Sequence, residues 1–249
     1  MRFITLITLV GLALLSVLTF EAIAQEFQFA VEDFVASSGE RWQILTPPFS
    51  TVASDNPNRA PELPENREYT ITEAVGNAFI GWPDGPEACC GDGSWVKYSV
   101  NVPATGTWYL WARAVVATQA DNSWFWAFDL ADDEVVSDDA NGAGPMNIWD
   151  VLESADLHDR FTLDWTWYPL VSRRGPHAGT EVGQYTDDRV GVELSAGTHT
   201  LHFSYREHSQ IDHVWASMEQ ARDPNVDAPA SVNPQGKLAA KWGEIKGGF

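Results

Sequence analysis

The six histidines are the first residues to test for catalysis or metal binding, and their spacing indicates neither. No HExxH pair is present, and no GxSxG elbow surrounds a serine nucleophile. Asp and Glu number 35, but no pattern marks the two carboxylates that a glycosidase requires. The sequence therefore predicts a protein without enzyme activity. The histidines are His158, His177, His199, His202, His208 and His213.

The two cysteines, Cys89 and Cys90, are adjacent, so zinc-finger and CxxC redox spacings are excluded. Three fates remain open: two reduced thiols, a bridge between two chains, or a vicinal disulfide. Neighbouring Cα atoms lie about 3.8 Å apart, which is less than the usual disulfide span. Glycines on both sides would let the backbone adapt. The segment 81–93, which contains them, is expected to form one wall of a ligand groove, and an ordinary Gly-rich turn is the alternative.

Tryptophan is abundant, with 12 residues beside 12 Phe and 6 Tyr. Large aromatic side chains supply much of the burial energy of a β-protein, and a flat indole also suits the apolar face of a sugar ring. Trp42, Trp82 and Trp149 fall in expected loops and are the predicted sugar-stacking residues; packing beneath a loop is the alternative. The others in expected strands are assigned to the core: Trp95, Trp108, Trp111, Trp124, Trp126, Trp165, Trp167 and Trp215.

The formal charge is −20 and the isoelectric point is about 4.4. A chain with this charge repels nucleic acid and anionic lipid at low salt, and it has no basic patch of the kind that nucleic-acid binding requires. Nucleic acid is therefore excluded as a partner.

The first 24 residues have the features of a signal peptide. Arg2 precedes the apolar run Ile4–Phe20, and Ala22-Ile23-Ala24 offers small residues for cleavage. An N-terminal membrane anchor is the alternative, but the run is near the lower limit for a span and no basic flank follows it. We therefore expect secretion, or display at the cell surface, with no membrane contact after cleavage. Residues 25–220 are expected to form one domain and 221–249 a linker and short tail.

Short aromatic and β-branched runs alternate with Gly, Pro, Asn and Asp clusters, which indicates an all-β chain. Ser94–Val102 alternates apolar and polar residues, whereas Thr107–Val116 is apolar on both faces apart from Arg113. Arg113 therefore needs a carboxylate partner or an edge position. The Pro-rich segment 47–64 is expected to be an irregular loop. An acidic insertion is expected over 131–160, with one helical turn within 146–157.

Four motifs carry a family resemblance by their order along the chain. They are SWVKYSVNVPATGTWYLWARA, DNSWFWAFD, WTWYPL and LSAGTHTLHFSYREHSQIDHVWAS, within residues 94–217. Together they resemble the carbohydrate-binding modules of families 6 and 35, in the galactose-binding-like superfold. The resemblance implies a two-sheet antiparallel jelly-roll sandwich, here with a long acidic loop insertion.

The resemblance also implies two sites. The family's structural calcium is held by acids of the first strand and by an Asp of the last strand, positions that match Glu32 and Asp212 here. Ala30 replaces the family's first acid, so the implied calcium site is incomplete. Gln210 occupies the position of a polar residue that hydrogen-bonds the sugar, and an amide can donate and accept at once.

Two functions follow as expectations. The first is a secreted, non-catalytic, lectin-like protein that recognises an extracellular glycan, which the spare tryptophans favour. The second is a structural protein of the cell surface or matrix that uses the sandwich for self-association. The tail and the adjacent cysteines favour this alternative.

Overall fold

The computed structural model describes residues 25–85, 94–135, 145–151, 161–170 and 189–226, and the backbone of 172–174. The signal peptide predicted over 1–24, the pair Cys89–Cys90 and the tail from residue 227 lie outside these ranges. Among the described residues, no helix has the length and apolar character needed to cross a membrane.

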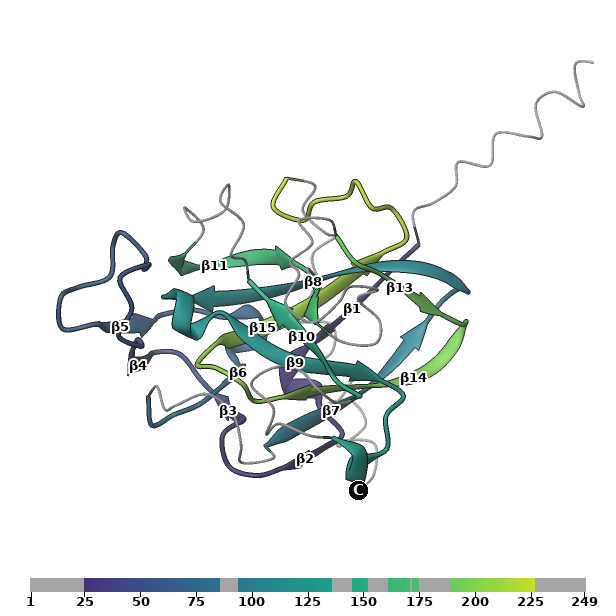
Figure 1. Ribbon diagram of the computed structural model, residues 1–249, viewed down its shortest axis with the longest axis horizontal. Helices are drawn as coiled ribbons and strands as arrows, with labels where there is room; N and C mark the ends of the chain where they lie inside the picture. The colour runs from purple at the N-terminus through teal and green to yellow at the C-terminus, as the bar shows by residue number, and fades with distance from the viewer. Residues whose placement is uncertain are drawn as a thin grey trace, which may run out of the picture.

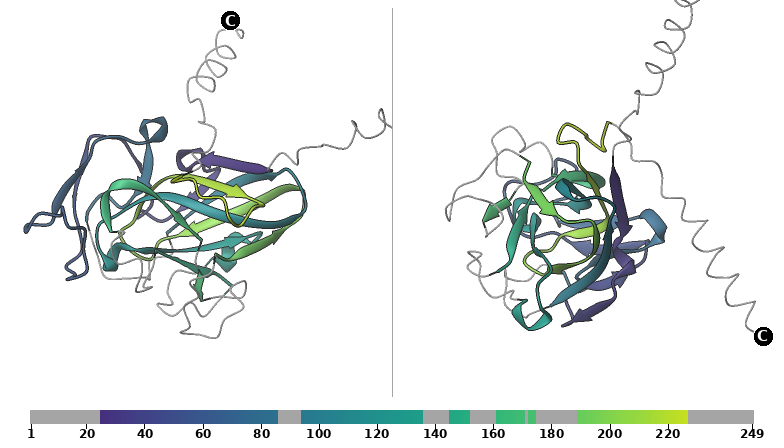
Figure 2. Two further views of the ribbon diagram at one scale, coloured as in Figure 1. Left: turned by 90° about the horizontal axis from the view of Figure 1, so that it is seen from above. Right: turned by 90° about the vertical axis from the view of Figure 1, so that its right-hand side faces the viewer.

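Two antiparallel sheets form the protein, as predicted, and Figures 1 and 2 show them as curled layers. The seven-stranded sheet contains β1 (Glu26–Ala30), β3 (Gln43–Leu45), β6 (Phe79–Gly81), β8 (Gly106–Val116), β11 (Thr162–Pro169), β13 (Gly191–Leu194) and β15 (Gln210–Ser217). The six-stranded sheet contains β2 (Ala36–Ser38), β7 (Trp95–Val102), β9 (Ser123–Phe128), β10 (Asn147–Asp150), β12 (Ser172–Arg174) and β14 (Gly197–Ser204). A separate hairpin pairs β4 (Phe49–Val52) with β5 (Glu68–Ile71).

The chain crosses between the two sheets repeatedly, which is typical of a jelly roll. It passes from β7 to β8, back to β9, and later from β13 to β14 and on to β15. The central pair of the seven-stranded sheet is β8 with β15, and β14 lies between β7 and β9 in the other sheet. The N-terminal strand β1 also pairs with β15, so the first and last strands are neighbours.

Alternation along the strands forms the core. In β7, Val96, Tyr98, Val100 and Val102 are buried, while the intervening residues face outward. Contacts across the layers join the sheets: the rings of Phe29 and Tyr98 lie 4.8 Å apart, and the Trp149 indole N–H donates to the Pro169 carbonyl at 3.1 Å.

Two expectations about loops are wrong. The Pro-rich segment contains strand β4, because Phe49 and Thr51 pack inward while the backbone pairs with β5. The acidic insertion is interrupted by β10, so Asn147–Asp150 is extended rather than helical and pairs with β9. Its four residues are all buried, which a solvated loop would not permit.

We predict that Trp149→Ala lowers the free energy of unfolding by about 3–5 kcal/mol, because it leaves a large cavity between the sheets. Urea denaturation followed by fluorescence measures this loss. Trp95→Ala is the matched control, since Trp95 keeps part of its surface in solvent. An equal loss in the two variants would contradict the assignment of Trp149 to the core.

Candidate functional site

One end of the sandwich carries an aromatic cluster that includes two of the predicted stacking residues. Trp42 and Trp82 each lie 6.4 Å from the ring of Tyr205, between ring centroids. The Arg41 guanidinium lies over both Tyr205 and Trp82, at 5.0 and 5.7 Å. Both tryptophans lie outside strands, as predicted, but they are only 4% and 8% exposed. Little of either indole is open to a ligand.

Gln210, the predicted hydrogen-bonding partner for sugar, lies fully buried beneath this end. Its Oε1 accepts from the Tyr69 hydroxyl at 2.8 Å, and its Nε2 donates to the His208 carbonyl at 3.2 Å. His208 contacts the Thr51 hydroxyl through Nε2 at 3.1 Å, and burial lowers its pKa to about 4, so the ring is neutral at pH 7. The Gln210 amide is thus used within the protein, holding the start of β15.

Trp149 is a correction to the predicted set. It lies in β10 rather than in a loop, and it is 0% exposed. Its ring packs against those of Trp124 and Phe203, at 5.2 and 6.1 Å. Trp149 is buried because it pairs with Trp124 of β9, so both side chains point from the same side of the sheet into the core. A ring with no exposed surface cannot stack on a sugar.

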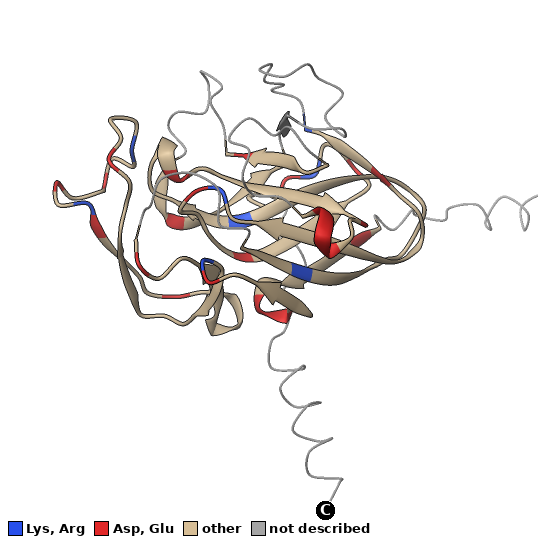
Figure 3. Cartoon of the chain, turned by 60° about the horizontal axis from the view of Figure 1, so that its bottom comes forward, with Lys and Arg blue, Asp and Glu red and all other residues tan. Residues whose placement is uncertain are grey.

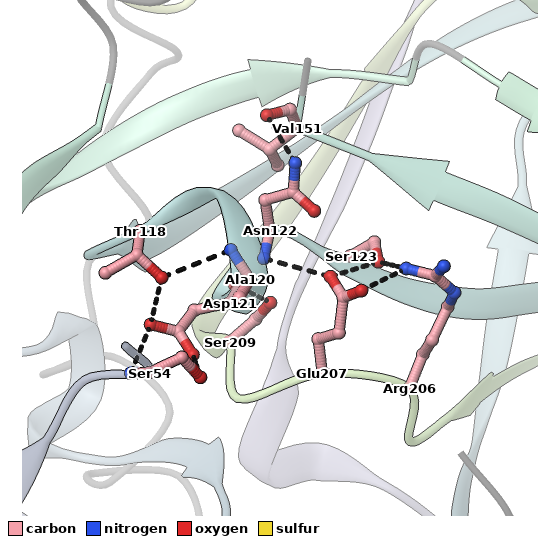
Figure 4. A network of polar contacts seen from close by, with 10 residues as sticks. All are labelled: Ser54, Thr118, Ala120, Asp121, Asn122, Ser123, Val151, Arg206, Glu207 and Ser209. Carbon is pink, nitrogen blue, oxygen red and sulfur yellow. Dashed lines mark hydrogen bonds and ion pairs between the residues drawn. The ribbon is translucent and has the colours of Figure 1, made fainter. Parts of the chain in front are cut away.

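A buried polar network holds the connection between β14 and β15 (Figure 4). Glu207 Oε1 accepts a hydrogen bond from the Arg206 guanidinium at 2.5 Å. Its Oε2 accepts the Ser123 hydroxyl at 2.6 Å and the Asn122 backbone N–H at 3.2 Å. Arg206 also donates to the Ser123 hydroxyl. Each oxygen of this carboxylate therefore has a protein donor.

Asp121 is the second carboxylate of the network. Its two oxygens accept the hydroxyl and backbone N–H of Ser54 and the hydroxyl of Thr118, the last at 2.8 Å. Its backbone carbonyl accepts the Ser209 hydroxyl at 2.7 Å. These bonds tie the loop after β4, the turn before β9 and the β14–β15 connection into one unit.

Burial dominates the acidity of these two groups. It raises the pKa of Asp121 to about 6, against the lowering effect of its hydrogen bonds with Ser54 and Thr118. It raises the pKa of Glu207 to about 7, against the lowering effect of the Arg206 charge. Raised pKa values are common in active sites and also in structural networks. Because every oxygen is bonded within the protein, this network is suited to positioning loops rather than to proton transfer.

Strand β11 carries two partly exposed tryptophans, Trp165 and Trp167, and both are half-buried. Trp167 pairs with Arg113 on the outer face of the seven-stranded sheet, whereas Trp165 packs against the core and donates its indole N–H to the Glu73 carbonyl. The Trp167 ring lies 5.7 Å from His213, whose Nε2 contacts Gln28 Oε1 at 3.3 Å. The Trp165 ring lies 5.7 Å from Phe79. Sequence alone assigned both tryptophans to the core. Trp165 does pack against the core, whereas the exposed part of Trp167 was missed, because the polar neighbours Asp164 and Thr166 gave no sign of which side faces water.

The sequence also assigned Trp95 to the core, yet it is half-buried on the outer face of the other sheet. Its ring lies 5.3 Å from His202, and the Lys97 ammonium lies 5.8 Å from its centroid. The remaining strand tryptophans are buried as predicted: Trp108, Trp111, Trp124, Trp126 and Trp215.

Arg113 has the carboxylate partner that its place in β8 required. Its Nη1 lies 2.5 Å from Asp212 Oδ2, and its guanidinium lies 5.4 Å from the Trp165 ring centroid. Burial raises the pKa of Asp212 to about 7, and the negative charge of Glu32 also raises it while Arg113 lowers it. The structure thus brings the two implied calcium ligands, Glu32 and Asp212, close together. Among the described side chains, no three His, Cys, Asp or Glu residues gather as a metal site would require.

No family model and no curated protein matches the sequence. Similar solved structures include the C-terminal family 6 carbohydrate-binding module of LamC, a laminarinase from Zobellia galactanivorans. That match has 16% identity and a TM-score of 0.37, and it covers 77% of this chain and 98% of that one.

Two further modules give comparable values. A family 6 module of Cellvibrio mixtus lichenase 5A, in complex with cellotriose, has 15% identity, coverage of 77% and 95%, and a TM-score of 0.36. A family 35 module from Clostridium thermocellum has 11% identity, coverage of 78% and 98%, and a TM-score of 0.36. These are the two families that the motifs resemble. With such low identities and TM-scores, the similarities assign no ligand to this chain.

We predict that Glu207 and Asp121 contribute increasing stability as the pH falls from 8 to 5, partly offset below pH 6.5 by His208, whose pKa is lowered. Glu207 and Asp121 have pKa values of about 7 and 6 in the folded state, above their unfolded values of 4.5 and 3.8. The folded state therefore binds more protons in this window, and each group contributes up to about 1.4 kcal/mol per pH unit. This contribution is complete below the unfolded pKa and is lost as the pH rises through the folded pKa.

Urea denaturation at several pH values tests this, with Glu207→Gln as the informative variant. Glu65→Gln is the control, because Glu65 is exposed and its loss removes the same unit of charge. We expect the free energy of unfolding to depend less steeply on pH in Glu207→Gln than in the wild type, and equally steeply in Glu65→Gln and the wild type. The same pH dependence in Glu207→Gln and the wild type would show that Glu207 does not contribute.

Proposed function

We propose that this chain is a secreted, non-catalytic protein that binds a neutral extracellular glycan on the outer face of the seven-stranded sheet. The observation that carries the proposal is the placement of Trp165 and Trp167. Successive residues on one side of a strand are separated by about 6.8 Å. Two indoles at this spacing, both half-buried, form a short row along β11, in which Trp165 also packs against the core and Trp167 lies on the outer face.

Polar groups beside this row supply hydrogen bonds for sugar hydroxyls. The Trp167 indole N–H has no hydrogen-bond partner among the described residues and is not buried. Gln28 of β1 is half-buried and is the side chain available here, since His213 of the adjacent strand β15 is only 3% exposed and contacts Gln28. Asn225 bonds both the backbone N–H and the carbonyl of Trp167, at 3.1 and 2.9 Å, which fixes this part of β11. A few oriented polar groups around an apolar surface are typical of ligand sites.

The charge of the chain selects the class of glycan. The net charge is −20, and Figure 3 shows acidic positions, in red, distributed along many of the described loops and strands. Polysaccharides that carry carboxylates or sulfates would be repelled at low salt. A neutral polysaccharide has no such penalty.

The non-catalytic part of the proposal is supported by the two carboxylates of the polar network, whose pKa values are raised. Asp121 is buried and Glu207 is largely buried in the polar network, and their oxygens accept hydrogen bonds from protein donors. The accessible row at Trp165 and Trp167 lies on β11, a separate element. Binding there relies on stacking and hydrogen bonds.

We predict that Trp167→Ala weakens glycan binding at least about tenfold, equivalent to about 1.4 kcal/mol. An array of neutral and anionic polysaccharides would identify a ligand, and calorimetry would then measure its affinity. Trp95→Ala is the matched control, since it removes a half-buried indole from the outer face of the other sheet. Equal affinity in wild type and Trp167→Ala would rule out this face. Selective loss in Trp82→Ala, with the fold retained, would favour the loop end instead.

Self-association remains the second candidate, and the strands at the sheet edges favour it. β3 ends the seven-stranded sheet and β2 ends the six-stranded sheet in the described structure. Next to these edges, Val35 and Ile44 are 61% and 47% exposed. An open edge with apolar side chains can pair with a second chain.

We predict, if the chain assembles through this edge, that Ile44→Lys reduces the mass measured by light scattering. A charge on an edge strand opposes pairing. Thr70→Lys places the same charge on the exposed side of β5 and is the control. A monomeric wild type with measurable glycan affinity would dismiss the assembly function.

A further inference from the structure

The calcium site implied by the family resemblance can be tested against the side chains that surround it. The two matching acids come from different elements: Glu32 from the 3-10 turn η1 (Val31–Asp33) and Asp212 from β15. Calcium requires six to eight oxygen ligands. The question is what the chain places between and around these two carboxylates.

Asp212 already has a cationic partner within the protein. Its carboxylate is fully buried, and Oδ2 accepts the Arg113 guanidinium at 2.5 Å and the Val75 backbone N–H at 2.9 Å. A calcium ion bound to the same carboxylate would lie close to the guanidinium, where little water is present to screen the repulsion between the two cations. Like charges at such a distance repel strongly.

Glu32 and Asp212 together supply at most four carboxylate oxygens, fewer than calcium requires. Asp212 Oδ1 is buried and has no hydrogen bond among the described residues. Glu32 lies directly under the turn η2 (Val75–Asn77), since a Cβ on Gly76 would come within 2.5 Å of its Oε1. Gly76 also has a positive φ of 70°, which a side chain would disfavour. This turn covers the two acids, and Ala30 provides no third carboxylate.

A β-bulge explains how Arg113 reaches Asp212. Ile211 pairs with Ala114, but His213 pairs with Arg113, so Asp212 is an extra residue on β15. The bulge re-aims its side chain outward, toward Arg113. The guanidinium is also stacked on Trp165 and its side chain is only 20% exposed. The arginine is therefore fixed in place on both sides.

We propose that Arg113 takes the place of the structural calcium ion, so that its guanidinium, rather than a divalent cation, holds Asp212 and the turn over Glu32. The residues present do not fit calcium. This part of the fold is consequently independent of divalent cations, and the inference does not depend on whether the protein binds glycans.

The first measurement is the melting temperature (Tm) of residues 25–249 in millimolar calcium and in excess chelator. We expect the same Tm in both conditions. A calcium-induced rise that Glu32→Gln abolishes would overturn the proposal, because it would place the ion at this pair. A rise that persists in Glu32→Gln comes from other acids and leaves this pair without calcium, as proposed.

The second measurement removes the guanidinium. Arg113→Met keeps an unbranched side chain without charge and leaves Asp212 unpaired, so we expect Tm to fall by about 6 °C or more. Lys97→Met is the control, since it breaks an ion pair at 2.7 Å whose Asp132 partner is 48% exposed. That variant should lose less than about 3 °C.

A double variant keeps the test decisive if Arg113→Met does not fold. Arg113→Met combined with Asp212→Asn removes both charges, so no unpaired carboxylate remains buried, and Tm should recover part of the loss. If Arg113→Met matches the wild type, or if the double variant is less stable than the single one, Arg113 is not the cation that holds this site.

Discussion

The pairing of β8 with β15 is the constraint on which the rest of the structure depends. These two strands form the centre of the seven-stranded sheet, and their register decides which side chains enter the core. Leu110 and Ala112 face inward, whereas Trp111 and Arg113 face outward. The bulge at Asp212 changes the alternation of β15 at one point only, so Asp212 and His213 both reach the outer face. The ion pair and the partners of Trp167 follow from that single extra residue.

The end of the sandwich where β14 turns into β15 is organised differently, by buried polar groups. Arg206, Glu207 and Ser209 bond to residues around the start of β9, and Gln210 bonds to Tyr69. Such groups are costly to bury unless each is satisfied. Their mutual bonding offsets much of this cost and explains why residues with ligand-like chemistry serve the fold there.

The two outer sheet faces are therefore the main accessible surfaces of the described chain that carry tryptophan. On one, Trp167 lies among hydrogen-bonding side chains; on the other, Trp95 lies beside Lys97 and His202. A rigid strand presents an indole with little loss of conformational freedom on binding, which favours recognition on a sheet face over recognition by a loop.

The sequence by itself determined the all-β class, most strand positions and the need of Arg113 for a carboxylate, because alternation and burial cost are local properties. It could not determine which tryptophans are exposed. Trp149 is buried because β10 pairs with β9, and Trp167 is partly accessible because β11 lies at one side of its sheet. Nor could it place Asp212 against Arg113, since a bulge depends on the register of two strands 99 residues apart. Only tertiary packing decides which side of an aromatic strand meets water.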